Sequence, residues 1–93
     1  MEYTERKRLE SLWRTSLVES YKDSPKLHNI IKEVDIDITL HVDYLSILLY
    51  VETDADKEHL PTDVQYDIKK RLQNISGVEP VELIVISYEE LPF

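Results

Sequence analysis

The chain contains no cysteine and a single glycine, Gly77, among its 93 residues. Without cysteine it has no disulfides, thiolate zinc sites, iron–sulfur clusters or cysteine nucleophiles. One glycine is too few for a glycine-rich phosphate loop, a dinucleotide-binding fingerprint or a G-x-S-x-G nucleophile elbow. The composition therefore excludes the enzyme classes that depend on these motifs.

Long apolar runs and positive charge are also scarce. No apolar run approaches the roughly 20 residues that span a bilayer, and the first residues lack the apolar core of a signal peptide. We therefore expect a cytoplasmic protein without membrane contact. Eleven Lys and Arg against nineteen Asp and Glu give a formal net charge of -8. This charge opposes contact with a polyphosphate backbone, so direct binding of nucleic acid is not expected.

Two amphipathic helices are predicted in the first third of the chain. From Thr4 to about Lys22, apolar residues recur at helical spacing with charged residues between them. Ser24 is a good N-cap and Pro25 suits the first helical position. A second, shorter helix is therefore predicted from Pro25 to about Lys32.

At residue 34 the period of the apolar residues changes from about 3.6 to 2, which predicts strands. Residues 34–42 alternate between apolar and polar side chains and predict a half-buried strand with an acidic outer face. Residues 45–51 are apolar on one face and partly apolar on the other, which predicts a more covered strand. Asp43 alone marks a hairpin between them, and one continuous bent strand is the alternative.

The rest of the chain predicts a polar loop over residues 52–59, a third helix, a strand and a tail. Pro61 and Thr62 open the helix, which stops near Gly77, and residues 80–88 form the strand. Lys69, Lys70 and Arg71 fall in the later turns of this helix, where they suit the negative end of its dipole.

These elements predict an α+β fold: a three-stranded sheet with helices packed on one face, in the order α-α-β-β-α-β. The chain is read as a single domain over residues 1–93. Residues 1–33 form its helical part, residues 34–88 its β-β-α-β part and residues 89–93 a loose tail. The apolar end of this tail, Leu91 to Phe93, either folds back over the sheet edge or serves as a docking peptide.

Acidic residues are concentrated in the middle of the chain. Residues 1–32 hold seven basic and five acidic side chains, whereas residues 33–68 hold ten acidic and one basic. Such a surface can steer a basic protein partner toward it, or it can simply keep a small protein soluble. Aromatic residues beside charged ones often anchor interfaces. If the acidic surface binds a partner, we therefore expect both acidic residues and tyrosines to take part. The candidate binding residues are Asp35, Asp37, Tyr44, Tyr50, Asp54, Asp56 and Glu58.

No metal, cofactor or catalytic site is predicted. Residues 54–65 superficially resemble a calcium loop, but the glycine at its sixth position is missing and Gln65 stands where a bidentate carboxylate is needed. The three histidines lie on different predicted elements and share no metal-ligand spacing. Asp35 and Asp37 share a strand face, roughly 7 Å apart by the strand rise, without pocket-forming loops beside them. We therefore predict a protein that is not an enzyme.

Several features of the chain also occur together in one known family. They are a helix with Leu12-Trp13, alternating strands, the segment Val51 to Leu60, a helix ending in Lys70-Arg71-Leu72-Gln73-Asn74 and a closing apolar strand. In this combination most of the chain resembles the C-terminal region of the gamma/tau subunit of bacterial DNA polymerase III, especially its Bacteroidetes form. The resemblance implies a non-enzymatic domain that mediates protein contacts within the replication machinery.

The leading hypothesis is a non-catalytic acidic protein–protein interaction domain with a basic partner, and its most specific form is a replication-machinery accessory module. An immunity protein, antitoxin or inhibitor that masks a basic, nucleic-acid-binding partner fits the size and charge equally well. A small-ligand binder or an enzyme is the third alternative, supported only by the carboxylates and histidines. The sequence leaves self-association open.

Overall fold

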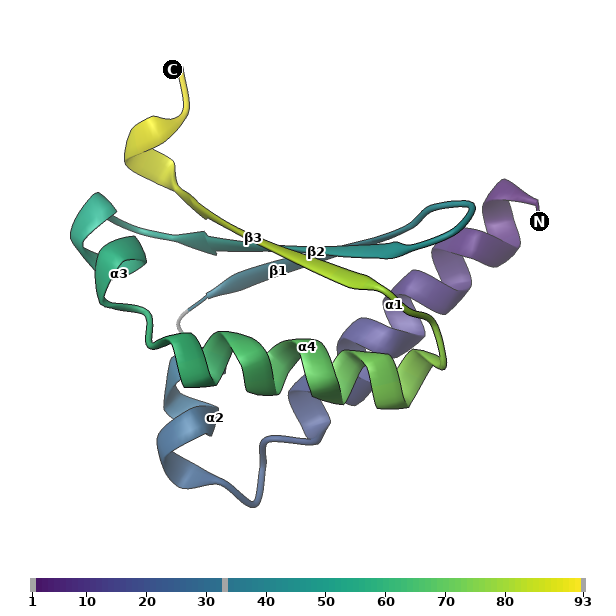
Figure 1. Ribbon diagram of the computed structural model, residues 1–93, viewed down its shortest axis with the longest axis horizontal. Coiled ribbons are helices and arrows are strands. Elements are labelled where there is room, and N and C mark those ends of the chain that lie inside the picture. The colour runs from purple at the N-terminus through teal and green to yellow at the C-terminus, as the bar shows by residue number, and fades with distance from the viewer. Residues whose placement is uncertain (1, 33, 93) are drawn as a thin grey trace.

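The computed structural model describes residues 2–32 and 34–92. Its elements are helices α1 (Tyr3–Glu19) and α2 (Pro25–Lys32), strands β1 (Asp35–Leu40) and β2 (Leu45–Val51), helices α3 (Asp54–His59) and α4 (Thr62–Ser76), strand β3 (Val81–Ser87) and a 3-10 turn, η1 (Tyr88–Glu90). The strands form one sheet, and α1, α2 and α4 lie on the same side of it (Figure 1). The α+β fold and the predicted order of its main elements are confirmed.

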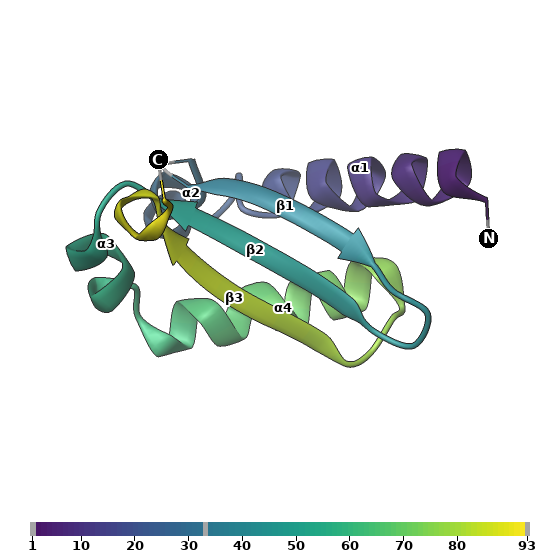
Figure 2. The ribbon, with the colours of Figure 1, turned by 90° about the horizontal axis from the view of Figure 1, so that it is seen from above.

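Strand β2 is the centre of the sheet, with β1 antiparallel on one side and β3 parallel on the other (Figure 2). The predicted hairpin is confirmed, because the backbone N–H of His41 donates to the carbonyl of Tyr44 at 2.9 Å. Parallel strands cannot be joined by a tight turn, so the chain crosses over between β2 and β3. Helix α4 forms most of this crossover and covers the sheet from below.

The hydrophobic core lies between the sheet and the helices. Alternate residues of each strand face the core, as do the apolar stripes of α1 and α4, because side chains repeat every 2 residues in a strand and about every 3.6 in a helix. The buried cluster consists of Trp13, Leu17, Tyr21, Ile31, Ile36, Ile38, Leu45, Ile47, Leu49, Val64, Ile68, Leu72 and Val81.

The loop prediction for residues 52–59 is wrong, because residues 54–59 form helix α3. The hydroxyl of Thr53 caps this helix by accepting a hydrogen bond from the backbone N–H of Asp56 at 3.1 Å. Asp54 and Asp56 also lie in its first turn, where negative charge is favourable. No residue of α3 is buried, so apolar periodicity could not indicate the helix.

The first helix also differs slightly from its prediction, since α1 ends at Glu19 rather than near Lys22.

Residues 89 and 90 of the C-terminal tail contact helix α3, so this part of the tail is not loose. Lys57 pairs with Glu90 at 2.5 Å, and the backbone N–H of Asp54 donates to Glu89 at 3.3 Å. The prediction that the chain end is free is therefore wrong for η1. Phe93, on which the alternative interpretations of the tail depend, lies outside the described residues.

Side chains of α1 close the outer edge of β1. The carboxylate of Glu10, whose residue is only 5% exposed, accepts a hydrogen bond from the backbone N–H of Leu40 at 2.7 Å. Arg14 Nε donates to the carbonyl of Ile36 at 2.9 Å. Unpaired backbone groups at a sheet edge invite pairing with other chains, so these contacts protect β1.

Tyr21, just beyond the end of α1, joins the first helix to α4. Its ring is fully buried, and its hydroxyl donates to Asp67 Oδ2 at 2.8 Å. Burial, and secondarily the contact with the Asp67 carboxylate, raise the pKa of Tyr21 far above its usual value. The folded protein therefore retains this proton at a pH where the unfolded chain releases it.

This difference predicts that stability decreases as the pH rises above about 10, the usual tyrosine pKa. Below that pH both states hold the proton, so the contribution of Tyr21 is complete. In Tyr21→Phe, we expect the free energy of unfolding to be about 1 kcal/mol lower at pH 8, because a hydrogen bond is lost, and to decrease less steeply above pH 10. Urea denaturation from pH 8 to 11.5 measures this.

Tyr66→Phe is the matched control, because Tyr66 lies on α4 and is 61% exposed. It should reproduce the wild-type slope. Parallel curves for wild type and Tyr21→Phe would contradict the prediction.

Candidate binding surface

In residues 2–32 and 34–92, no α-helix covers the sheet face that points away from α1, α2 and α4, and η1 rises above one end of this face (Figures 1 and 2). The register places its side chains in three rows across the strands. These rows are Asp35–Tyr50–Ile86, Asp37–Leu48–Ile84 and Thr39–Ser46–Glu82, and we call these residues the open face.

The centre of the open face is apolar. Leu48, Tyr50 and Ile86 are half-buried, and Ile84 is 46% exposed. Leu48 lies directly beside Ile84, and Tyr50 beside Ile86, so the four side chains form one stripe across β2 and β3. A solvent-facing sheet surface usually carries polar residues, so an apolar stripe here is typical of an interaction surface.

An aromatic stack lies at the hairpin end of the sheet. The rings of His41 and Tyr44 are parallel within 8°, with centroids 4.1 Å apart. His41 Nε2 is hydrogen-bonded to the hydroxyl of Ser46 at 2.9 Å, which seats the stack on the open face. Ser46 is buried at the surface of the sheet as a result.

A second aromatic stack lies at the other end of the same face. The ring centroids of Tyr50 and Tyr88 are 5.6 Å apart, and the Tyr88 hydroxyl donates to the carboxylate of Asp35. This hydrogen bond raises the pKa of Tyr88 above its ordinary value. Tyr88 thus contacts both Tyr50 in the apolar stripe and the acidic residue Asp35 on β1.

Charge is segregated between the two layers of the molecule. The three strands contain no lysine or arginine, and all eleven of these residues lie on the helices or on the connection between α1 and α2. The strands carry only carboxylates, from Asp35, Asp37 and Glu82, and these flank the apolar stripe. The open face is therefore both apolar and acidic, as a surface for a basic amphipathic partner would be.

The structure divides the predicted binding residues into two groups. One group is on or beside the open face and contains Asp35, Asp37, Tyr44 and Tyr50. The other is on α3, beyond the ends of β2 and β3, and contains Asp54, Asp56 and Glu58.

Sequence reasoning missed Leu48, Ile84, Ile86, His41 and Tyr88 as members of the surface. The signal was present, because apolar residues occupy both faces of β2 and β3. That pattern is equally typical of a strand covered on both sides, so it could not show that one side is open.

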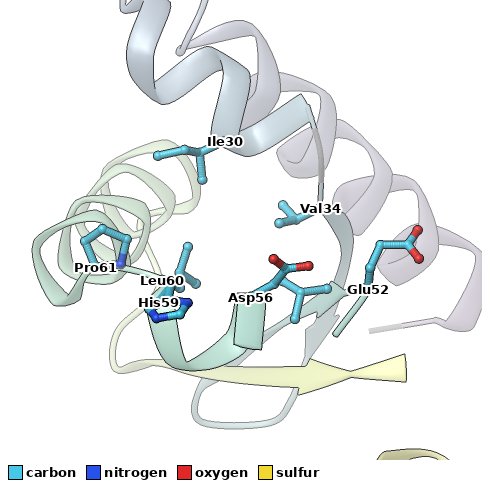
Figure 3. A pocket seen from close by; sticks show the side chains of 8 residues that line it. Ile30, Val34, Glu52, Asp56, His59, Leu60 and Pro61 are labelled. Carbon is cyan, nitrogen blue, oxygen red and sulfur yellow. The ribbon is translucent and has the colours of Figure 1, made fainter. Parts of the chain in front are cut away.

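A cavity of about 540 Å³ lies near the second group, between α2, α3 and the end of β2. Its lining is Ile30, Val34, Val51, Glu52, Asp56, His59, Leu60 and Pro61. Figure 3 shows the Asp56 carboxylate directed toward Val34 and the Glu52 carboxylate turned away from the centre. Apolar walls beside a carboxylate would accept an apolar group that carries a positive charge.

Within residues 2–32 and 34–92, no group of three His, Asp or Glu side chains is placed to hold a metal ion. No helix in this part of the chain is both long and apolar enough to cross a membrane. Comparisons of the chain with protein-family models, with curated proteins and with solved structures give no match.

Proposed function

We propose that this protein is a non-catalytic, cytoplasmic interaction domain whose open face binds a basic amphipathic segment of a protein partner. The proposal rests on one observation: an uncovered apolar stripe flanked by carboxylates, on a sheet without lysine or arginine.

The two components of this surface have different roles in binding. Burying the stripe formed by Leu48, Tyr50, Ile84 and Ile86 supplies most of the affinity, at about 25 cal/mol per Å² of apolar area. The carboxylates mainly accelerate association and select the sign of the partner's charge. An amphipathic helix with basic flanks satisfies both components, because its apolar side faces the stripe and its cations reach the carboxylates.

The resemblance to the gamma/tau subunit supports a replication accessory module as the specific form of this domain. Its partner would then be a basic protein of that machinery. An immunity protein or inhibitor of a basic nuclease is the alternative, and it would use the same acidic face. Inhibition of a nuclease, measured with its substrate, separates the alternative from a module that binds without blocking activity.

Neutralising the carboxylates of β1 tests the proposed surface. The probe is a synthetic helical peptide with leucine on one side and lysine on the other. In Asp35→Asn with Asp37→Asn, we expect the association rate to fall about tenfold at low salt, with a smaller change in the dissociation rate. Wild-type association should also slow as salt screens the charges. Stopped-flow fluorescence measures both rates.

Asp54→Asn with Asp56→Asn removes the same number of charges from α3, away from the open face. This control should keep the wild-type association rate within about twofold. Equal effects of the two double variants would assign the rate to net charge and reject the open face as the site. A peptide with lysine on all sides should bind much more weakly, because it cannot cover the apolar stripe.

A further inference from the structure

A second pocket, of about 410 Å³, lies between α1, the β1–β2 hairpin and the connection from α4 to β3. These three segments come together at the same end of the molecule (Figures 1 and 2). Most of its lining is apolar and consists of Leu9, Trp13, Leu40, Val42 and Val78. None of these residues belongs to the open face, and the volume is within the range of small-molecule sites.

Hydrogen bonds hold the walls of this pocket in place. The backbone N–H of Leu40 donates to the carboxylate of Glu10 at 2.7 Å, and the backbone N–H of Val78 donates to the hydroxyl of Ser76 at 3.1 Å. Trp13 is only 8% exposed and is packed in the hydrophobic core. The pocket is therefore largely formed before a ligand enters, so binding requires little reorganisation.

Arg6 lines the pocket and has no bonding partner. Its Nε is covered from solvent and has no acceptor among the described residues, and its guanidinium forms no ion pair in this part of the chain. Glu10, about one turn further along α1, pairs with Lys7 instead. The other polar lining residue, His41, is bonded to Ser46 through Nε2. Covering a charged donor without an acceptor is unfavourable, and an anionic ligand would supply the missing acceptor.

We propose that this pocket binds a small carboxylate with an apolar body, such as an aryl or alkyl carboxylic acid. The guanidinium of Arg6 bonds to the two carboxylate oxygens, and a small rotation of this long side chain brings Nε–H to one of them. The apolar body lies against Leu9, Trp13 and Val78. A phosphate fits less well, because it carries up to two charges and further oxygens, whereas the lining offers one permanent cation among apolar walls.

Titration with hydrocinnamate tests the proposal on the full chain. Trp13 is the only tryptophan of the sequence, so its fluorescence reports directly on this pocket. We expect a saturable change with a dissociation constant of about 1 mM or tighter. Hydrocinnamamide has the same shape without the charge and should bind at least about tenfold more weakly. Equal binding of the amide, or no saturable change with the carboxylate, would overturn the proposal.

Arg6→Met removes the cation and keeps an apolar chain of similar length. It should raise the dissociation constant of hydrocinnamate at least about tenfold. Since Nε–H of Arg6 has no acceptor among the described residues, this variant should unfold at the wild-type temperature or above it, which circular dichroism measures.

Arg8→Met is the matched control, because it removes the same charge from an exposed position of the same helix, outside the lining. Its dissociation constant should stay within about twofold of wild type. Equal weakening by the two variants would assign the effect to net charge and overturn the proposal. Unchanged binding in a destabilised Arg6→Met would also overturn it, because Arg6 would then be purely structural.

Two further titrations separate this pocket from other sites. A saturating amount of the amphipathic peptide should leave the affinity for hydrocinnamate unchanged, because the peptide covers the open face and not this pocket. Inorganic phosphate, which has no apolar body, should give no saturable change in Trp13 fluorescence. Competition by the peptide, or binding of phosphate as tight as that of hydrocinnamate, would overturn the proposal.

Discussion

Ile47→Ala is expected to lower the free energy of unfolding by about 3 to 4 kcal/mol, because it opens a cavity that the core cannot fill. Ile47 is fully buried at the middle of β2, paired with Ile38 on one side and Leu83 on the other. Hydrogen-bonded strands on both sides prevent the backbone from collapsing into the space. A domain of this size has about 5 to 15 kcal/mol of stability, so much of it is lost. Urea denaturation followed by circular dichroism measures the change.

The adjacent substitution Leu48→Ala is the control for this prediction. Leu48 points to the open face and is half-buried, so its truncation leaves no internal cavity and should cost about 1 kcal/mol or less. It should nevertheless weaken binding of the amphipathic peptide, because it removes part of the apolar stripe. Equal destabilisation by the two substitutions would mean that both sheet faces are buried, and the open face would then not exist.

Arg71→Ala is expected to cost about 2 to 3 kcal/mol, because its guanidinium joins two helices. Its Nε donates to Asp67 at 2.7 Å, and a terminal nitrogen donates to the carbonyl of Ser20 at 2.7 Å. The guanidinium carbon also lies 4.1 Å from the centre of the Tyr21 ring. Hydrogen bonds to charged groups are the stronger ones, and this side chain is only partly exposed, so solvent weakens them less than at the surface.

Arg71→Lys should not restore this stability. The planar guanidinium of arginine can bond to Asp67 and Ser20 at the same time and stack on the Tyr21 ring, and the ammonium of lysine cannot. Lys69→Ala, at a neighbouring exposed position of the same helix, should change stability by less than about 0.5 kcal/mol. The measurement is again urea denaturation. Wild-type stability in Arg71→Lys would show that charge alone is sufficient.

Arg71 also shows where sequence reasoning reaches its limit. Its position in the later turns of the helix predicts a favourable interaction with the dipole of that helix. In the structure it binds the carbonyl of Ser20, the C-cap residue of α1, 51 positions earlier in the chain. The two interpretations predict different effects, because a surface dipole contact contributes less than about 1 kcal/mol.

The sequence by itself determined the types of most elements and their order. Periodicity is a local property, so the change at residue 34 and the amphipathic stripes of the helices could be read without knowing the fold. The excess of acidic over basic side chains within residues 33–68 could also be read without knowing the fold. Helix α3 was missed because it buries none of its residues and so has no apolar period.

Only the tertiary structure decided the strand order, the parallel pairing of β3 and the division of the candidate carboxylates between the open face and α3. It also decided that α1 closes the edge of β1. These properties depend on which distant segments pack together. A strand with apolar residues on both faces has the same sequence pattern whether a helix covers one face or both, so burial and exposure at this sheet follow from where the helices lie.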